Sequence, residues 1–174
     1  MRKEKGFSLI ELLIVVAIIL IIAAIAVPNL LKSKMAANEA SAAATLRSVA
    51  TANVTYSTSY GIGYAPSLVA LGPPASGNGT SAAADLVDSV IGKDPALKSG
   101  YTFTYTPGVA APTASAPNNT YSVDASPTTP ATTGNSTFCL DQTNKVGKDP
   151  TGTNGTAADA KATGCDYTKF IPLQ

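Results

Sequence analysis

A run of apolar residues near the start of the chain constrains the fold more than any other feature. Residues 12–27 contain no charged side chain, and the carboxylate of Glu11 is the only charge among residues 9–27. About 20 apolar residues in a helix span the hydrocarbon core of a bilayer, so the run is long enough for a membrane helix. An acidic group inside such a helix costs about 2.5–3.5 kcal/mol at the bilayer centre. Glu11 therefore needs a partner, and we expect subunit assembly to provide one.

Two simpler interpretations leave features of this segment unexplained. A secretory signal peptide has a basic start and a cleavage site with small residues, for which Ala24-Ile25-Ala26 would serve. However, Glu11 interrupts the beginning of the apolar core, and the run is longer than the core of an ordinary signal peptide. A simple membrane anchor explains the length of the run but gives no role to Gly6, Phe7 or Glu11.

Residues 6–11, GFSLIE, together with the apolar run and Pro28, resemble the start of type IV pilins and of their pseudopilin relatives. The resemblance implies that a membrane-embedded prepilin peptidase cuts after Gly6 and that Phe7 becomes the N-methylated N-terminus. It also implies that Glu11 is the carboxylate of subunit assembly. The processed chains would then polymerise through their N-terminal helices into a helical filament, with the help of a pilus assembly machinery.

Elementary electrostatics agrees with this resemblance. Cleavage after Gly6 would leave an ammonium group on Phe7, and the N-terminus of a helix carries partial positive charge, so Glu11 would have a cationic partner. A pair between Glu11 and the Phe7 amine of a neighbouring subunit forms at one axial offset only. Gly6 suits a cleavage site, because the absence of a side chain leaves the peptide bond open to a protease.

The charges before the apolar run predict the orientation of the chain. Arg2, Lys3 and Lys5 precede the run and only Glu4 offsets them, so the leader should stay cytoplasmic and the bulk of the chain should be exported. The resemblance implies a bacterial inner-membrane precursor and then an extracellular pilus. The full chain has 12 basic and 11 acidic residues, a balance that does not indicate a general nucleic-acid binder.

The residue types argue against catalysis. The sequence has no His and no Trp, which excludes the Ser-His-Asp and Cys-His arrangements and most zinc sites. We therefore predict a protein that is not an enzyme, with no cofactor and no metal. Calcium is the one alternative considered, since aspartate oxygens are its usual ligands, but the dense spacing of a calcium loop is missing. The aspartates concerned are Asp141, Asp149, Asp159 and Asp166.

The spacing of apolar residues predicts one long helix from Phe7 to about Tyr56, ending by Tyr60-Gly61. Pro28 removes a backbone donor inside it, so we expect a kink or a local break just before that residue. Four charged residues should mark a solvated face: Lys32, Lys34, Glu39 and Arg47. A semi-apolar stripe should pack against a globular head: Ala42, Leu46, Val49, Asn53, Tyr56 and Tyr60.

We expect an α+β fold with four segments: a cleaved leader (1–6), a transmembrane or filament-core helix (7–30), its amphipathic second half (31–60) and a globular head (61–174). Ser81 is predicted to cap a short helix over residues 82–91. Alternating residues predict strands at 101–106, 120–124 and 136–141, forming an antiparallel meander against the helix stripe. The tail after Val146 is polar and is expected to be surface loop.

Cys139 and Cys165 form an even pair in an exported segment, which indicates a disulfide. Closing a loop of about 25 residues would contribute about 3 kcal/mol. By strand alternation Cys139 should point away from the core and hold the C-terminal loop on the outer side of the sheet. The arrangement resembles the pilin head, in which a disulfide tethers the C-terminal loop.

Three functions remain open at this point. The first is a structural pilus subunit that serves adhesion, motility or DNA uptake. The second is a pseudopilin of a type II secretion system, a class that more often lacks the tethered loop, so the cysteine pair favours the pilin. The third is a membrane-anchored binding module, for which Glu11 would be dispensable.

Overall fold

The computed structural model describes residues 7–152, 160–161 and 164–173. The chain begins with the 52-residue helix α1 (Leu9–Tyr60), and six strands form one antiparallel sheet in the order β1-β2-β3-β4-β5-β8. It divides into two compact units, residues 1–34 and 35–174, and α1 runs through both. The predicted α+β class is confirmed.

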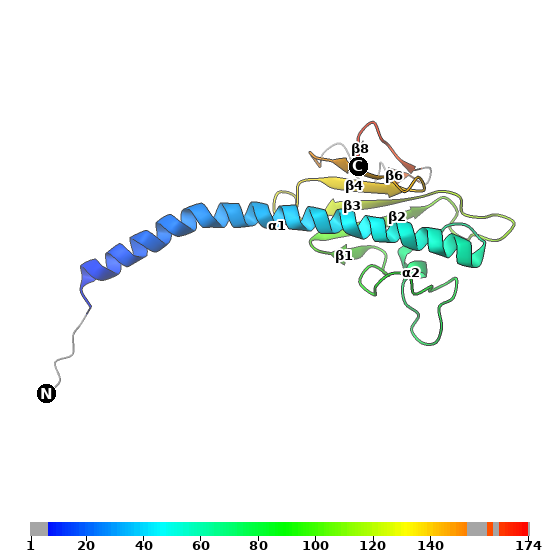
Figure 1. The fold of residues 1–174 in the computed structure, drawn as a ribbon, viewed down its shortest axis with the longest axis horizontal. Coiled ribbons are helices and arrows are strands. Elements are labelled where there is room, and N and C mark those ends of the chain that lie inside the picture. The colour runs from blue at the N-terminus through cyan, green and yellow to red at the C-terminus, as the bar shows by residue number, and fades with distance from the viewer. Residues whose placement is uncertain (1–6, 153–159, 162–163, 174) are drawn as a thin grey trace. The chain divides into compact units, whose positions relative to one another are not determined.

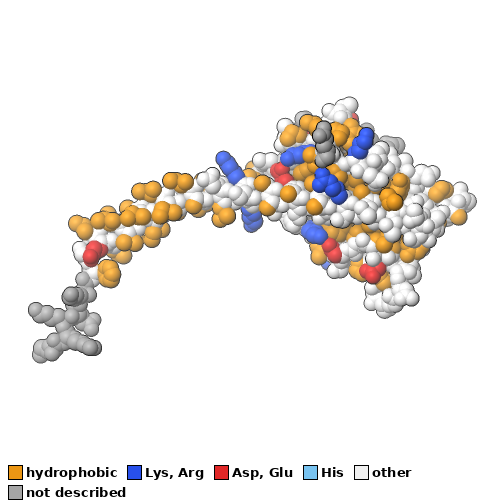
Figure 2. All heavy atoms as spheres, in the orientation of Figure 1, with side chains coloured by type: hydrophobic (Ala, Val, Ile, Leu, Met, Phe, Trp, Pro, Cys, Tyr) orange, Lys and Arg blue, Asp and Glu red, His pale blue; other side chains and the backbone are white. Residues whose placement is uncertain are grey.

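The part of α1 in the first unit exposes its apolar side chains. Phe7 is 90% exposed and Leu31 is 41% exposed, and the large apolar side chains between them are exposed as well. Figure 2 shows this part of the helix coated with hydrophobic side chains. By length and composition the helix could cross a membrane. This surface therefore needs a bilayer or other protein chains to cover it.

The helix is continuous through Pro28. The predicted local break is therefore wrong for the single subunit. Proline removes one hydrogen bond, to the carbonyl four residues earlier, and the bonds on both sides hold the helical conformation. The predicted kink at Pro28 stays a prediction.

The sheet of the second unit is a meander with short strands at both edges. The predicted strands are β2 (Tyr101–Pro107), β3 (Tyr121–Pro127) and β4 (Thr137–Asp141), which pair in antiparallel order. Sequence reasoning missed the edges, β1 (Ala96–Lys98) on one side and β5 (Val146–Asp149) with β8 (Ile171–Pro172) on the other. A small second sheet pairs β6 (Ala160–Lys161) with β7 (Gly164–Cys165).

The C-terminal part of α1 packs on one face of this sheet, as Figure 1 shows. The predicted stripe is buried from Ala42 to Tyr56, and Tyr60 is half-buried against it. The inward-facing strand residues belong to the same core cluster, as predicted: Tyr101, Phe103, Tyr105, Tyr121, Val123, Phe138 and Leu140. The apolar residues that alternate along the strands and those that recur at helical spacing in α1 therefore pack together in one core.

The helix predicted over residues 82–91 is absent, and this prediction was wrong. A four-residue helix, α2 (Leu68–Leu71), forms earlier, and Ser67 caps it by accepting a hydrogen bond from the Ala70 N–H. In the later segment the backbone N–H groups of residues 84–87 donate to α2 and its C-cap, and those of Leu86 and Val87 share the Leu71 carbonyl. These long-range bonds replace the local bonds that a helix would need.

The tail after Val146 was also mispredicted, because it contributes β5 and β8 to the main sheet. β5 pairs with β4 and β8 pairs with β5, so the C-terminal segment returns to the sheet after about twenty residues. Its residues are too polar and the strands too short for a period to reveal them. Only the long-range pairing defines them.

A buried amide network fixes the chain after the end of α1. The Asn53 Oδ1 atom accepts the Ala65 N–H at 3.1 Å, and Asn118 Nδ2 donates to the Ala65 carbonyl at 3.1 Å. The Tyr105 hydroxyl lies 2.7 Å from the Ala65 carbonyl oxygen and 3.1 Å from Asn53 Oδ1, so it donates a shared hydrogen bond. Buried polar groups specify a unique arrangement when each is satisfied.

Two buried tyrosines in this core provide a matched pair of substitutions. The rings of Tyr105 and Tyr121 stack with their centroids 5.6 Å apart. Among the described residues the Tyr121 hydroxyl has no hydrogen-bond partner. Tyr105→Phe should lower the free energy of unfolding by about 1 kcal/mol, because it removes a shared hydrogen bond. Tyr121→Phe should leave it unchanged or raise it by up to about 1 kcal/mol, since an unpaired buried hydroxyl is removed. Urea unfolding of the full chain in detergent measures both, and equal losses would contradict the assignment.

Candidate processing and assembly site

The candidate site is the start of α1, where the predicted cleavage and assembly residues lie close in sequence. Phe7 and Ser8 precede the helix, which begins at Leu9. Glu11 occupies the first turn, and its Oε2 atom accepts the backbone N–H of Ser8 at 3.0 Å. Gly6 lies outside the described residues. Phe7 therefore lies directly before a helix whose first turn is capped.

The Ser8–Glu11 bond is the glutamate half of a capping box, a role for Glu11 that sequence reasoning missed. In this motif a Glu three residues after the capping Ser accepts the N–H of that Ser. The S-x-x-E pattern at residues 8–11 was the available signal. The bond supplies the carboxylate with one donor inside its own chain, which offsets part of the cost of placing it in a membrane. An acidic group here also suits the positive end of the helix dipole.

The carboxylate of Glu39 in α1 was expected to be solvated, but it joins the helix to the sheet of the second unit. Glu39 Oε1 accepts the backbone N–H groups of Asn135 at 3.0 Å and Ser136 at 3.2 Å. Its Oε2 atom accepts the Ser136 hydroxyl at 3.1 Å and pairs with Lys148 Nζ at 3.0 Å. The prediction that Glu39 belongs to a solvated face was therefore wrong. The Glu39 side chain joins the helix to β5 and to the two residues that precede β4.

These contacts lower the pKa of Glu39. Partial burial acts to raise its pKa, but hydrogen bonds from Asn135, Lys148 and Ser136, with the charge of Lys148, hold the pKa below the ordinary 4.5. A carboxylate with a lowered folded pKa contributes stability that is fully present above its unfolded value. That contribution is lost as the pH falls through the folded pKa.

Glu39→Ala should lower the free energy of unfolding at pH 7 by about 2 kcal/mol, because it strands two backbone donors and a lysine. Glu39→Gln keeps an acceptor for the two N–H groups, so it should cost about half as much. Both variants should lose less stability than the wild type between pH 5 and the folded pKa of Glu39. Arg47→Ala is the control, since Arg47 is exposed and should change stability by less than about 0.5 kcal/mol. Urea titrations at several pH values measure the free energy of unfolding of each chain. If Glu39→Gln lost as much stability below pH 5 as the wild type does, the assignment would be contradicted.

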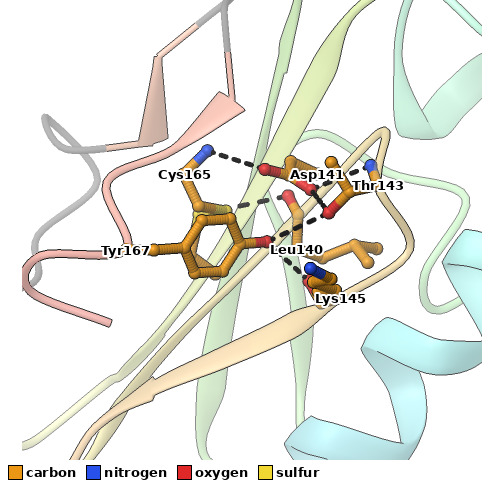
Figure 3. Close-up of a disulfide and its surroundings, with 7 residues drawn as sticks. Leu140, Asp141, Thr143, Lys145, Cys165 and Tyr167 are labelled. Atoms are coloured by element: carbon orange, nitrogen blue, oxygen red, sulfur yellow. Dashed lines mark hydrogen bonds between the residues drawn. A yellow bond between two sulfur atoms is a disulfide. The ribbon is translucent and has the colours of Figure 1, made fainter. Parts of the chain in front are cut away.

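The Cys139–Cys165 disulfide is present, with Cα atoms 5.9 Å apart. Cys139 is fully buried in a second cluster with Phe170, on the other side of the sheet from the main core, as predicted. In Figure 3 the Tyr167 ring lies beside the disulfide. Its hydroxyl donates to the Lys145 carbonyl at 3.1 Å, and burial is the main cause that raises the pKa of Tyr167 to about 12. The C-terminal loop is thus held by the disulfide, by the partly buried Tyr167 ring and by hydrogen bonds.

Three of the four aspartates considered for calcium accept hydrogen bonds within their own turns. In each of three Asp-x-Thr segments the threonine two residues later donates both its N–H and its hydroxyl to the same Asp Oδ1 atom. These pairs are Asp141 with Thr143, Asp149 with Thr151, and Asp166 with Thr168. Asp159 lies outside the described residues. Within the described part of the chain, no group of three or more potential metal ligands comes together.

Comparison with known proteins concerns the N-terminal segment. The prokaryotic N-terminal methylation motif matches residues 1–27. The chain is 62% identical over 39 residues to the type IV wide pilus major component PilA4 of Thermus thermophilus, covering 22% of this chain and 30% of that protein. It is 44% identical over 54 residues to the type IV major pilin protein PilA of Myxococcus xanthus, covering 31% of this chain and 24% of that protein. The matched segments thus span less than a third of either relative, and no solved structure matches significantly.

Proposed function

We propose that the protein is a structural subunit of a type IV pilus, because its N-terminal segment matches the prokaryotic N-terminal methylation motif and is similar to the corresponding segments of two type IV pilins. The precursor sits in the bacterial inner membrane with its leader in the cytoplasm and its head exported. Prepilin peptidase cuts after Gly6, and Phe7 becomes the N-methylated first residue. An assembly machinery then moves the subunit into an extracellular filament that serves adhesion, motility or DNA uptake.

The observation that carries this proposal is the exposed apolar surface of α1. In the single chain the large side chains from Phe7 to Leu31 are all more than 40% exposed. Full burial of one such side chain is favourable by about 1.5–3 kcal/mol, so this surface has a strong drive to be covered. A bilayer covers it before assembly, and the helices of other subunits cover it in the filament.

Glu11 gives this association its register. Its carboxylate accepts a hydrogen bond from the Ser8 N–H of its own chain. A carboxylate can accept several more. The Phe7 ammonium of an adjacent subunit would add a charge-assisted bond at one axial offset, and other offsets would leave both charges unpaired in an apolar core. The capping bond and the contact between subunits are compatible on one carboxylate.

Mass spectrometry of the N-terminus in sheared surface filaments tests the proposal. The expected result is an abundant peptide that begins at methylated Phe7. The same peptide found in the membrane fraction alone would move the function to a pseudopilin of a type II secretion system. An intact Met1 or a cut after Ala26 would overturn the assignment altogether.

A further inference from the structure

The apolar run of α1 ends at two exposed lysines. Residues 12–31 carry no charged side chain, and Lys32 and Lys34 follow directly, with Ser33 between them. Both lysine side chains are exposed. Within the part of the chain that the structure describes, neither lysine forms an ion pair. The two cations are therefore available to a partner of opposite charge.

The length of the uncharged run matches the thickness of a bilayer. Residues 12–31 rise by about 30 Å at 1.5 Å per residue, and the hydrocarbon core of a bilayer is about 30 Å thick. With this run in the hydrocarbon, Glu11 lies at one surface and Lys32 at the other. A lysine can keep its methylene groups against the acyl chains while its ammonium group extends into the headgroup layer. Both ammonium groups can therefore reach the lipid phosphates.

The two lysines point to different sides of the helix. Residues two positions apart are rotated by about 200° around a helix with 3.6 residues per turn. Figure 2 shows basic side chains on both sides of α1 where its apolar coat ends. A protein chain packed along one side of α1 would cover one of the two lysines, whereas a headgroup layer surrounds the helix at this level. The arrangement therefore favours a lipid surface as the partner.

The neighbouring polar side chains are occupied by the helix itself. The Asn29 Nδ2 atom donates to the Ile25 carbonyl at 3.1 Å, and the Ser33 hydroxyl donates to the Asn29 carbonyl at 3.0 Å. These bonds supply polar groups near the boundary with partners inside the chain. The lysines are thus the groups at this end of the run that can bind an anion.

We propose that Lys32 and Lys34 bind the phosphate groups of anionic phospholipids in the outer leaflet of the inner membrane. Lysine binds a phosphate as a point charge, and basic residues beside a membrane helix attract anionic lipids. This inference rests on the membrane-inserted precursor of the proposed function and adds its lipid partner. Phosphate contacts at this end fix the depth of α1, so the peptide bond before Phe7 is held at the cytoplasmic surface.

Lipids that carry a nitroxide quencher test this contact in vesicles that contain the full chain. Cys139 and Cys165 are bonded to each other and no cysteine is free, so Ser33→Cys supplies one thiol for a fluorophore between the two lysines. Phosphatidylglycerol with a nitroxide near the top of its acyl chain should quench this fluorophore about threefold more than phosphatidylcholine with the same nitroxide. Adding Lys32→Gln and Lys34→Gln should bring the ratio close to one, whereas Lys32→Arg and Lys34→Arg should preserve it.

Arg47→Gln is the matched control, because Arg47 is an exposed basic residue further along the same helix. This variant should keep the quenching ratio of the labelled parent chain. Inorganic phosphate separates a lipid site from a site for the free ion, since it should reduce the preference no more than sodium chloride at equal ionic strength.

Three results would overturn the proposal: equal quenching by the two lipids, a preference that survives the double glutamine change, or a loss specific to inorganic phosphate. A fluorophore at Leu20→Cys monitors insertion, because Leu20 lies near the middle of the uncharged run. If nitroxides at the ends of the acyl chains do not quench it, the chain is outside the bilayer. That result would instead overturn the membrane step of the proposed function.

Discussion

Glu11→Ala is expected to reduce sheared surface filaments more than tenfold, with the subunit retained in the membrane. The substitution removes the acceptor of the Ser8 N–H and the charge that would pair with Phe7 of a neighbour. Loss of the hydrogen bond costs about 1 kcal/mol in the helix cap. If subunits pack as proposed, loss of the charge would also leave the ammonium group of the neighbouring subunit unpaired among apolar helices, and this would be the larger effect.

Glu11→Gln separates these two roles. Its amide oxygen can still accept the Ser8 N–H, so the cap of α1 is kept, but the side chain is neutral. If charge pairing between subunits drives assembly, this variant should fail nearly as severely as Glu11→Ala. Glu11→Asp keeps the charge on a shorter side chain and should assemble better than either.

Filament yield by shearing and immunoblot measures all three variants, and the amount of subunit in the membrane fraction is the control for expression. Wild-type yield from Glu11→Gln would show that the cap alone matters. Wild-type yield from Glu11→Ala would remove the assembly role and favour a membrane-anchored binding module.

Regular periodicity made most of the head predictable. The alternating Tyr, Phe and Thr residues of β2 and the helical spacing from Ala42 to Tyr60 each required one buried face, and these faces meet in the core. Alternation also placed Cys139 on the other face of the sheet, where the disulfide and Phe170 lie. Local patterns are reliable here because the same residues satisfy secondary structure and burial together.

The errors arose where distant residues decide the structure. Nothing near Glu39 in the sequence indicates that the Asn135 and Ser136 amides will approach its carboxylate from 96 and 97 residues away. Residues 82–91 have an apolar pattern compatible with a helix, but the backbone N–H groups of residues 84–87 donate to the segment that ends at Gly72. At the candidate site the role of Glu11 in assembly stays a prediction. Its hydrogen bond to Ser8 was missed, because residues 8–11 were not recognised as a capping box.

Gly63→Ala is expected to lower the free energy of unfolding by about 3 kcal/mol, one of the largest losses available from a single added methyl group. Gly63 has a φ of +82°, where an L-residue pays about 1–2 kcal/mol. An added Cβ would also overlap the carbonyl oxygen of Asn118 and stand 2.7 Å from its backbone nitrogen and carbon. Because the neighbour is backbone, relief requires moving the chain, which adds about 1–3 kcal/mol.

Gly61→Ala is the matched control for backbone strain. Gly61 has a similar φ of +65°, but its added Cβ would meet nothing within 4 Å, so the expected loss is about 1 kcal/mol. The difference between the two variants isolates the close approach of Gly63 to Asn118. That approach allows the Tyr64 N–H to donate to the Asn118 carbonyl at 2.7 Å, and the Asn118 N–H to donate to Ile62 at 3.0 Å.

Urea unfolding of the two variants in detergent gives the difference, and hydrogen exchange of the Tyr64 and Asn118 amides locates it. Both amides should exchange faster in Gly63→Ala and stay protected in Gly61→Ala. Equal losses of stability would mean that strain alone governs both positions. A larger loss at Gly63 would mean that the end of α1 is fixed by this backbone contact, through which the loop places Ala65 over Asn53 and Tyr105.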